Sequence, residues 1–321
     1  MTTLSLAPPP PVVLVAVDRA ATLVAVEERL RAVLGGSAGK GLTATAAAHL
    51  VLAPAAHRAR PRLMLAFAAL AAPRGVNVDR LIAMACAVEL IHSASLLHDD
   101  VVDGADQRRG RPSVNATHGN AAAVLVGDQV LATALQLLSF DVRAMRAAVD
   151  VVAAMSVAAV REVEVRADAG VDVATLAEVA DGKTAALFGL CGTFAGLLAD
   201  DDDAGARLCG AARALGLAFQ LADDADDVVN DLVERTPTGP IARACLDPMI
   251  SLALHALWSA PLIDVESARG LASAMKSGTA IPAIQKQVRE LIDSALDALA
   301  PWQGLDGHDD VAAFAARVAR F

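Results

Sequence analysis

Two aspartate clusters are the residues of this chain with the clearest potential for chemistry. Asp99–Asp103 (DDVVD) and Asp223–Asp227 (DDADD) each follow an apolar stretch with helical spacing. Side chains three and four positions apart share one face of a helix, so each cluster directs several carboxylates the same way. Carboxylate oxygens suit Mg²⁺, which usually keeps waters and takes substrate phosphates as further ligands. The spacing therefore predicts two halves of a magnesium–diphosphate site.

Basic residues accompany the clusters along the chain. Arg108 and Arg109 follow the first cluster in a glycine-containing loop, where guanidinium groups can hold phosphate oxygens. Lys183, one of four lysines, is predicted to begin an apolar helix, where its charge opposes the helix dipole. We interpret that conflict as favouring a functional role. The predicted chemistry is ionisation of an allylic diphosphate, with metal and basic groups stabilising the departing pyrophosphate.

The elements that position these clusters are predicted to be helices. Between glycine- and proline-containing breakers the apolar residues recur at helical spacing, and no strand alternation is visible. The chain is 55% hydrophobic but only 3% aromatic and has no tyrosine, which disfavours a β-rich fold. We expect an all-α bundle of roughly ten or more helices. Residues 1–20 are predicted to be a disordered leader and residues 21–321 a single domain.

Charge and cysteine usage exclude several classes of protein. A formal net charge of −10 argues against a nucleic-acid surface, which needs clustered basic residues. The four cysteines are scattered without a C-x-x-C pair, as expected for reduced thiols in a cytoplasmic protein. The longest uncharged run, residues 184–199, is shorter than a typical membrane span, so no transmembrane segment is predicted.

The ordered landmarks of the chain resemble the trans-isoprenyl diphosphate synthases, also called polyprenyl synthetases. The resemblance is strongest over Glu89–Val130, and it continues at Lys183-Thr184 and at Phe219-Gln220 with the second cluster. It implies the isoprenoid synthase fold, with helices around a deep central cavity. It also implies a homodimer and three Mg²⁺ per active site when diphosphate is bound.

The resemblance assigns roles to individual residues. Metal ligands are expected among Asp99, Asp100, Asp103, Asp223, Asp224 and Asp227. The allylic diphosphate is expected to contact Arg108, Lys183, Thr184 and Gln220, and isopentenyl diphosphate to contact His57, Arg60, His92 and Arg109. The residues expected to carry catalysis are Asp99, Asp103, Asp223, Lys183 and Arg108.

The implied reaction joins isopentenyl diphosphate to an allylic diphosphate and gives a longer trans-polyprenyl diphosphate. In such enzymes the product length depends on side chains one or more helical turns before the first aspartate. Here the nearest positions are Ala94 and Ser95, both small, which favours a product of C20 or longer.

Three segments depart from the family pattern. Ala55-Ala56-His57 stands where the family has Gly-Gly-Lys, and Arg161–Val165 replaces its Gly-Glu-x-x-Gln element. Residues 228–248 lack the glycine-lysine pairs that close over the allylic diphosphate, leaving Arg235 and Arg243 as candidate replacements. Two alternatives stay open: an enzyme, similar to terpene synthases, that uses an allylic diphosphate without isopentenyl diphosphate, or a non-catalytic modulatory subunit.

Overall fold

The computed structural model describes residues 14–35, 51 and 57–320. Most of the predicted leader, and Ala55-Ala56, lie outside these ranges. Within residues 14–20, Val15 forms an antiparallel bridge with Val76, and the first helix, α1, begins at Arg19. The last residues of the predicted leader are therefore placed against the helical body.

Helices make up most of the described chain, which confirms the all-α prediction. Their bounds are α1 Arg19–Gly35, α3 Ala59–Ala71, α4 Val78–Val102, α5 Val114–His118, α6 Asn120–Leu137, α7 Val142–Glu164, α8 Val173–Ala180, α9 Ala186–Ala199, α10 Asp202–Asp226, α11 Val228–Glu234, α12 Gly239–Ala244, α13 Pro248–Ser259, α14 Val265–Ser277, α15 Ala280–Ala298 and α16 Asp306–Val318. Short π and 3₁₀ turns lie at Asp181–Ala185 and Ala300–Trp302.

One small hairpin corrects the expectation of a loop without strands after the first cluster. β1 (Gln107–Arg108) pairs antiparallel with β2 (Arg111–Pro112). The two turn residues, Arg109 and Gly110, have φ of 54° and 73°. A two-residue hairpin turn with both φ values positive matches the twist of its strands. Glycine at the second position adopts a positive φ without the clash that a Cβ would cause. The hairpin thus fixes Arg108 and Arg109 beside the end of α4.

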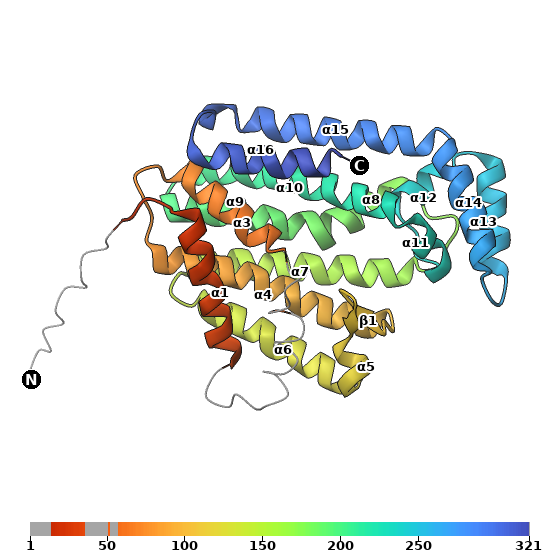
Figure 1. Ribbon diagram of the computed structural model, residues 1–321, viewed down its shortest axis with the longest axis horizontal. Coiled ribbons are helices and arrows are strands. Elements are labelled where there is room, and N and C mark those ends of the chain that lie inside the picture. The colour runs from red at the N-terminus through yellow and green to blue at the C-terminus, as the bar shows by residue number, and fades with distance from the viewer. Residues whose placement is uncertain (1–13, 36–50, 52–56, 321) are drawn as a thin grey trace, which may run out of the picture.

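The core lies along α4, α9 and α10; α4 and α9 are buried around most of their circumference, and α10 buries one face. Helix α9 packs on α10 so closely that a Cβ added at Gly196 would lie 2.3 Å from the Cα of Gly205. Only glycine permits that approach of two backbones. Figure 1 shows α15 and α16 covering α10, and α1 crossing the opposite side of the bundle.

The two acidic clusters lie at the same end of the bundle. Asp99–Asp103 forms the last turn of α4, and Asp223–Asp227 the last turn of α10. The hairpin that follows α4 and the helix α11 that follows α10 appear at one end of the molecule in Figure 1. Both carboxylate clusters therefore converge on one region.

Three helical stretches are long and apolar enough to cross a membrane by length and composition. In an apolar 18-residue window of Val78–Val102, 78% is buried inside the protein, and in such a window of Val173–Ala199, 72% is buried, so packing accounts for their apolar character. Asn120–Leu137, helix α6, is only 28% buried. It leaves Val124 and Leu125 exposed, and α7 also carries exposed apolar residues such as Val157 and Val160.

Candidate active site

Each carboxylate of the first cluster has its own basic partner. The Asp99 Oδ2 atom lies 3.8 Å from the ammonium nitrogen of Lys183. Asp100 is buried and accepts a hydrogen bond of 2.7 Å from Nε of Arg108 in the hairpin. Asp103 pairs with the guanidinium of Arg166, which follows α7. Three separate segments thus neutralise the end of α4.

Burial is the largest influence on the pKa values of Asp99 and Asp100 despite their basic partners. It raises the pKa of Asp99 above its usual value, and although Lys183 opposes the shift, Glu162 and Asp103 add to it. Burial likewise raises the pKa of Asp100 against the opposing hydrogen bond from Arg108. Burial alone would lower the pKa of Lys183, but Asp99 and Glu162 raise it above its usual value. Lys183 is therefore a firmly charged ammonium group.

Lys183 lies in a π-helical turn, Asp181–Ala185, within a continuous helical stretch from Val173 to Ala199. The prediction that Lys183 begins a helix is wrong. Gly182 does not break the helix but allows close packing, because a Cβ there would lie 2.7 Å from Cβ of Ala158 on α7. Single π turns inside α-helices occur often at functional sites.

This π turn contacts both acidic clusters through adjacent side chains. Lys183 is hydrogen-bonded to Glu162 and lies beside Asp99 of the first cluster. The hydroxyl of Thr184 donates to Oε1 of Gln220 at 2.5 Å. The amide of Gln220 in turn donates to Oδ1 of Asp224 in the second cluster at 2.6 Å. The structure thus brings together five of the predicted site residues: Asp99, Lys183, Thr184, Gln220 and Asp224.

The second cluster has no such set of basic partners. Among the described residues, no ion pair joins Asp223, Asp224, Asp227 or Asp231 to a lysine or arginine. Burial raises the pKa of Asp224 to about 7, and burial together with Asp224 and Asp227 raises the pKa of Asp231 to about 8. The pKa of the more exposed Asp223 is also raised by burial, Asp227 and Asp226. Within the described chain, these carboxylates therefore lack the ion-pair partners that the first cluster has.

The donor set fits a divalent cation. Oδ2 of Asp231 is buried and accepts no hydrogen bond, and its neighbours are carboxylates whose mutual repulsion a cation would relieve. Within the described ranges, no three His, Cys, Asp or Glu side chains are grouped closely enough to hold a metal ion alone. A divalent cation at this position would therefore take further ligands from water and from a substrate phosphate, as Mg²⁺ often does in proteins.

The residues expected to bind isopentenyl diphosphate come from three elements. The guanidinium of Arg60 on α3 lies 4.8 Å from the ring centre of Phe188, and its buried Nε has no partner. Burial, and then Arg60 and Arg109, hold the pKa of His92 well below its usual value, so His92 is neutral. Arg109 lies in the hairpin turn. His57 is exposed at the start of α3, and its carbonyl accepts from Arg62 at 3.3 Å.

An unpredicted ionic network fixes the beginning of α3. Arg58 adopts a left-handed conformation with φ of 53° and is 5% exposed. Its Nε donates to Glu27 on α1 and its Nη1 to Glu89 on α4, each at 2.5 Å, while Nη2 donates to the Val51 carbonyl at 2.6 Å. Strained backbone of this kind persists only where surrounding contacts determine it. Arg58 therefore determines where Arg60 lies.

Arg235 and Arg243, the candidate replacements for the absent glycine-lysine pairs, bond to groups outside the predicted site. Arg235 bonds the carbonyl of Ala260, and Nη2 of Arg243 lies 3.3 Å from Oε1 of Gln287 on α15. Within the described chain, neither side chain forms a hydrogen bond or ion pair with a predicted site residue. The structure instead adds three residues that the sequence analysis did not assign to the site, namely Glu162, Arg166 and Asp231.

An apolar pocket of about 110 Å³ begins at the first cluster. It runs between α4, α6 and α7 and is lined by Asp99, Lys183, Ser95, Ala94, Ile91, Leu131 and Met155, among others. The predicted small residues Ala94 and Ser95 form its wall. The pocket has polar chemistry at one end and apolar side chains along its length.

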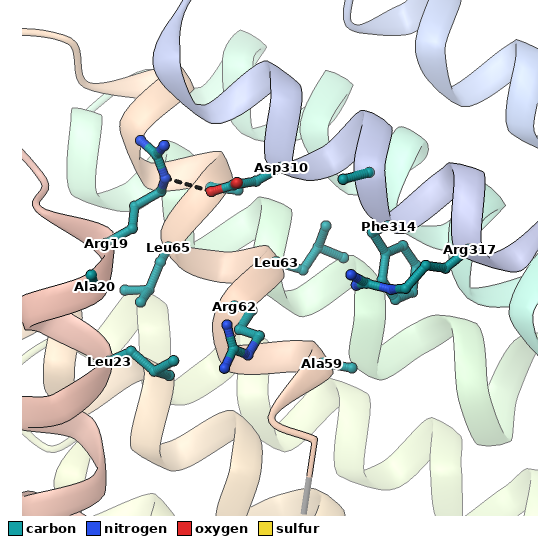
Figure 2. A pocket seen from close by; sticks show the side chains of 12 residues that line it. Arg19, Ala20, Leu23, Ala59, Arg62, Leu63, Leu65, Asp310, Phe314 and Arg317 are labelled. Carbon is teal, nitrogen blue, oxygen red and sulfur yellow. Dashed lines mark hydrogen bonds and ion pairs between the residues drawn. The ribbon is translucent and has the colours of Figure 1, made fainter.

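A second cavity, of about 340 Å³, lies between α1, α3 and α16 and is shown in Figure 2. Arg19 and Asp310 form an ion pair across it, and Arg62 and Arg317 contribute further guanidinium groups. None of the predicted site residues lines this cavity. It is therefore separate from the candidate active site.

Together, the helical bundle, the two carboxylate clusters joined through Lys183 and Thr184, and the adjoining apolar pocket define a prenyltransferase. The chain belongs to the polyprenyl synthetase family, which matches residues 42–237. It is a trans-prenyltransferase of the polyprenyl diphosphate synthase class, and enzymes of this class use divalent metal ions.

Several relatives illustrate the similarity. The chain is 36% identical to geranylgeranyl diphosphate synthase of Mycobacterium tuberculosis over 262 residues, which cover 74% of this chain and 73% of that protein. It is 30% identical to heptaprenyl diphosphate synthase component 2 of Geobacillus stearothermophilus, over 86% and 88% of the two chains. A polyprenyl synthase from Caulobacter crescentus, solved with calcium and isoprenyl diphosphate, superposes with a TM-score of 0.88 at 27% identity, over 97% and 99% of the chains.

Proposed function

We propose that this prenyltransferase condenses isopentenyl diphosphate with an allylic diphosphate to form a trans-polyprenyl diphosphate of C20 or longer, using three Mg²⁺ ions. The observation that carries the proposal is the π turn between the two acidic clusters. Lys183 lies against Asp99, and Thr184 reaches Asp224 through Gln220. A diphosphate held between the clusters therefore meets a charged ammonium group and fixed polar side chains.

The protein residues divide the work of ionisation. Bound Mg²⁺ would supply positive charge that stabilises the leaving pyrophosphate. Its protein ligands would be Asp99 and Asp103 from the first cluster and Asp223, Asp224 and Asp227 from the second. Lys183 and Arg108 add fixed positive charge next to the first cluster. Gln220 orients Asp224 by donating a hydrogen bond to one of its oxygens. These groups are already in place before substrate arrives.

The second substrate would approach from the side of α3. Arg60, neutral His92 and Arg109 surround that region, and a diphosphate would give the unpaired Nε of Arg60 an acceptor. His57 stands where the family has a lysine, and it is exposed.

The apolar pocket would hold the growing prenyl chain. It starts at Asp99 and Lys183 and continues past Ala94 and Ser95 to Ile91 and Met155. Because small residues line its first turn, a farnesyl chain is not blocked there. A phenylalanine at position 95 would narrow the pocket beside the reacting end and shorten the product.

The test is incubation of the purified protein with Mg²⁺ and farnesyl diphosphate, with and without isopentenyl diphosphate, followed by mass spectrometry of the products. The proposal expects a longer diphosphate only when both substrates are present, and a shorter product from Ser95→Phe. Pyrophosphate release and a hydrocarbon or alcohol product from farnesyl diphosphate alone would favour the alternative of an enzyme similar to terpene synthases. No turnover with any C10–C20 allylic substrate would favour a modulatory subunit.

We also propose that two copies associate through α6 and α7. Leu125 on α6 and Val157 and Val160 on α7 are 67%, 72% and 60% exposed. Large apolar side chains that gather on a protein surface often mark an interaction site. Light scattering after size exclusion should give twice the chain mass of 32.8 kDa, and Val157→Glu should reduce it to one chain. A monomeric wild-type protein would contradict this proposal.

Domain organisation and location remain proposals as well. The main apolar core contains residues from Val26 on α1 to Val318 on α16, and a smaller cluster from Val228 to Ala280 lies between its members in the chain. The main core joins both ends of the described chain, which supports a single domain over residues 21–321. The four cysteines are free thiols, which supports a cytoplasmic location.

A further inference from the structure

The segment after α7 carries an arginine that no motif of the sequence assigns to the site. Arg166 donates to Oδ1 of Asp103 in the first cluster, and its Nη1 lies 3.3 Å from the carbonyl of Val102. Its Nε is buried and has no acceptor. A buried N–H of a charged group that lacks an acceptor is uncommon and costly in proteins. This guanidinium therefore has donor capacity left for a ligand.

The backbone places Arg166 between the two clusters. The next residue, Ala167, has φ of 62°, and its N–H donates to the carbonyl of Arg235 at 2.9 Å. Arg235 ends α11, the helix that directly follows the second cluster. The segment is thus bonded through its side chain to the end of α4 and through its backbone to the end of α11. A ligand that bridges the clusters lies beside Arg166.

Other cations near the second cluster do not occupy this position. Arg235 and Arg243 are directed to Ala260 and Gln287, and Lys183 lies deeper, between Asp99 and Glu162. The Arg166 side chain is 31% exposed and its partner Asp103 is 36% exposed, so the guanidinium is accessible to an incoming anion and the carboxylate to a metal ion. A guanidinium also presents a planar set of donors that matches phosphate oxygens.

From this geometry we propose that Arg166 is a positioning residue for the allylic diphosphate and replaces the lysines absent after the second cluster. In the free protein it neutralises Asp103. With metal and diphosphate bound, Asp103 would serve as a metal ligand and the freed guanidinium would bond the diphosphate oxygens. The proposal rests on the function proposed above, because it assigns a residue to the allylic half of that site.

The test measures binding as well as turnover. Farnesyl thiolodiphosphate, whose sulfur leaving group prevents ionisation, is titrated in the presence of Mg²⁺ into wild-type protein and into the Arg166→Gln and Arg166→Lys variants. Loss of a charge-assisted hydrogen bond should weaken binding about tenfold or more in Arg166→Gln, and Arg166→Lys should recover part of it. Arg161→Gln, which removes an exposed arginine paired with Glu164, is the matched control and should bind as the wild type does.

A second readout separates positioning from a purely structural role. With Mn²⁺ alone, Arg166→Gln should bind metal more tightly than the wild type, because Asp103 no longer has a competing cation. The Michaelis constant for the allylic substrate should rise while that for isopentenyl diphosphate stays constant. Unchanged thiolodiphosphate affinity and unchanged metal affinity in a folded Arg166→Gln protein would overturn the proposal. An inactive wild type that still binds the thiolodiphosphate through Arg166 would instead refute the proposed condensation.

Discussion

The two acidic clusters have nearly the same sequence but different electrostatic states. In the first, Asp99, Asp100 and Asp103 are paired with Lys183, Arg108 and Arg166. In the second, the described chain supplies no basic partner, and the pKa values of Asp224 and Asp231 rise to about 7 and about 8. Two motifs of similar sequence can therefore differ in how their charge is neutralised. The first is already neutralised by protein, whereas the second depends on a ligand for its positive charge.

The largest expected effect comes from removing a carboxylate from either cluster. Asp99→Ala and Asp223→Ala should each lower kcat about 10³-fold, since a catalytic metal contributes several kcal/mol to the barrier. The measurement is pyrophosphate release at saturating substrate and Mg²⁺. Asp200→Ala, which removes an exposed acid paired with Arg143, is the control and should keep full activity. If one cluster proved dispensable, the two would not form one site.

The second cluster should make stability depend on pH and on Mg²⁺. Carboxyl groups with raised pKa values keep their protons in the folded state after the unfolded chain has lost them. The free energy of unfolding in EDTA should therefore fall as the pH rises from about 4 through 7 and 8, by on the order of a few kcal/mol for the pair. Stabilisation by Mg²⁺ should grow over the same range.

Urea unfolding at pH 6, 7.5 and 9, with EDTA or Mg²⁺, measures this dependence. The double variant Asp224→Asn with Asp231→Asn serves as the comparison, because it removes both titrations while keeping the side-chain size. Its free energy of unfolding should change less with pH than that of the wild type. An identical pH slope in the two proteins would place the titrating groups elsewhere.

Removing a charged side chain should change the free energy of unfolding in opposite directions at the two clusters. Asp231→Asn should raise the free energy of unfolding at pH 9 in EDTA by about 1 kcal/mol, because it removes an unpaired buried carboxylate. Arg108→Gln should lower it by about 1–2 kcal/mol, because Asp100 loses its partner, discounted for the partial exposure of Arg108. Arg111→Gln, at an exposed position in the same hairpin, is the control. If both substitutions changed the free energy of unfolding in the same direction, the two clusters would not differ electrostatically as described.

The smallest effect concerns the connection between the clusters. Glu162→Gln leaves Lys183 with only the more distant carboxylate of Asp99. The ammonium should then be less firmly placed, and the Michaelis constant for the allylic substrate should rise about threefold with little change in kcat. Glu164→Gln, an exposed acid on the same helix, should change neither constant. A loss of kcat instead would mean that Glu162 contacts the reacting groups.

Much of this site was predictable because its chemistry is local in sequence. The i, i+1 and i+4 spacing identified both clusters, and helical geometry placed them at helix ends. Asp231 continues the same four-residue spacing after Asp223 and Asp227, so that signal was present and was missed. Lys183 was recognised as functional for a reason that the structure does not support, because it lies in a π turn inside a longer helix.

Other features could not be predicted because they depend on tertiary packing. The partners Arg58 and Glu27 are 31 positions apart, and Arg166 and Asp103 are 63 apart. No local pattern reports which of many surface arginines meets which acid. The hairpin after α4 was also missed, since two-residue strands have no detectable alternation and the signal lay in the turn residues alone.

The contact of Gly196 with Gly205 gives the interior a direct influence on the distant chemistry. It lies near the closed end of the α9–α10 hairpin, while Thr184 and Gln220 lie toward the open end, about 18 Å away along α9 at 1.5 Å per residue. A side chain added at the closed end would push α9 and α10 apart and change the spacing between Thr184 and Gln220. Two glycines that never contact the substrate therefore help to set the distance over which Thr184 reaches Gln220 and, through it, Asp224.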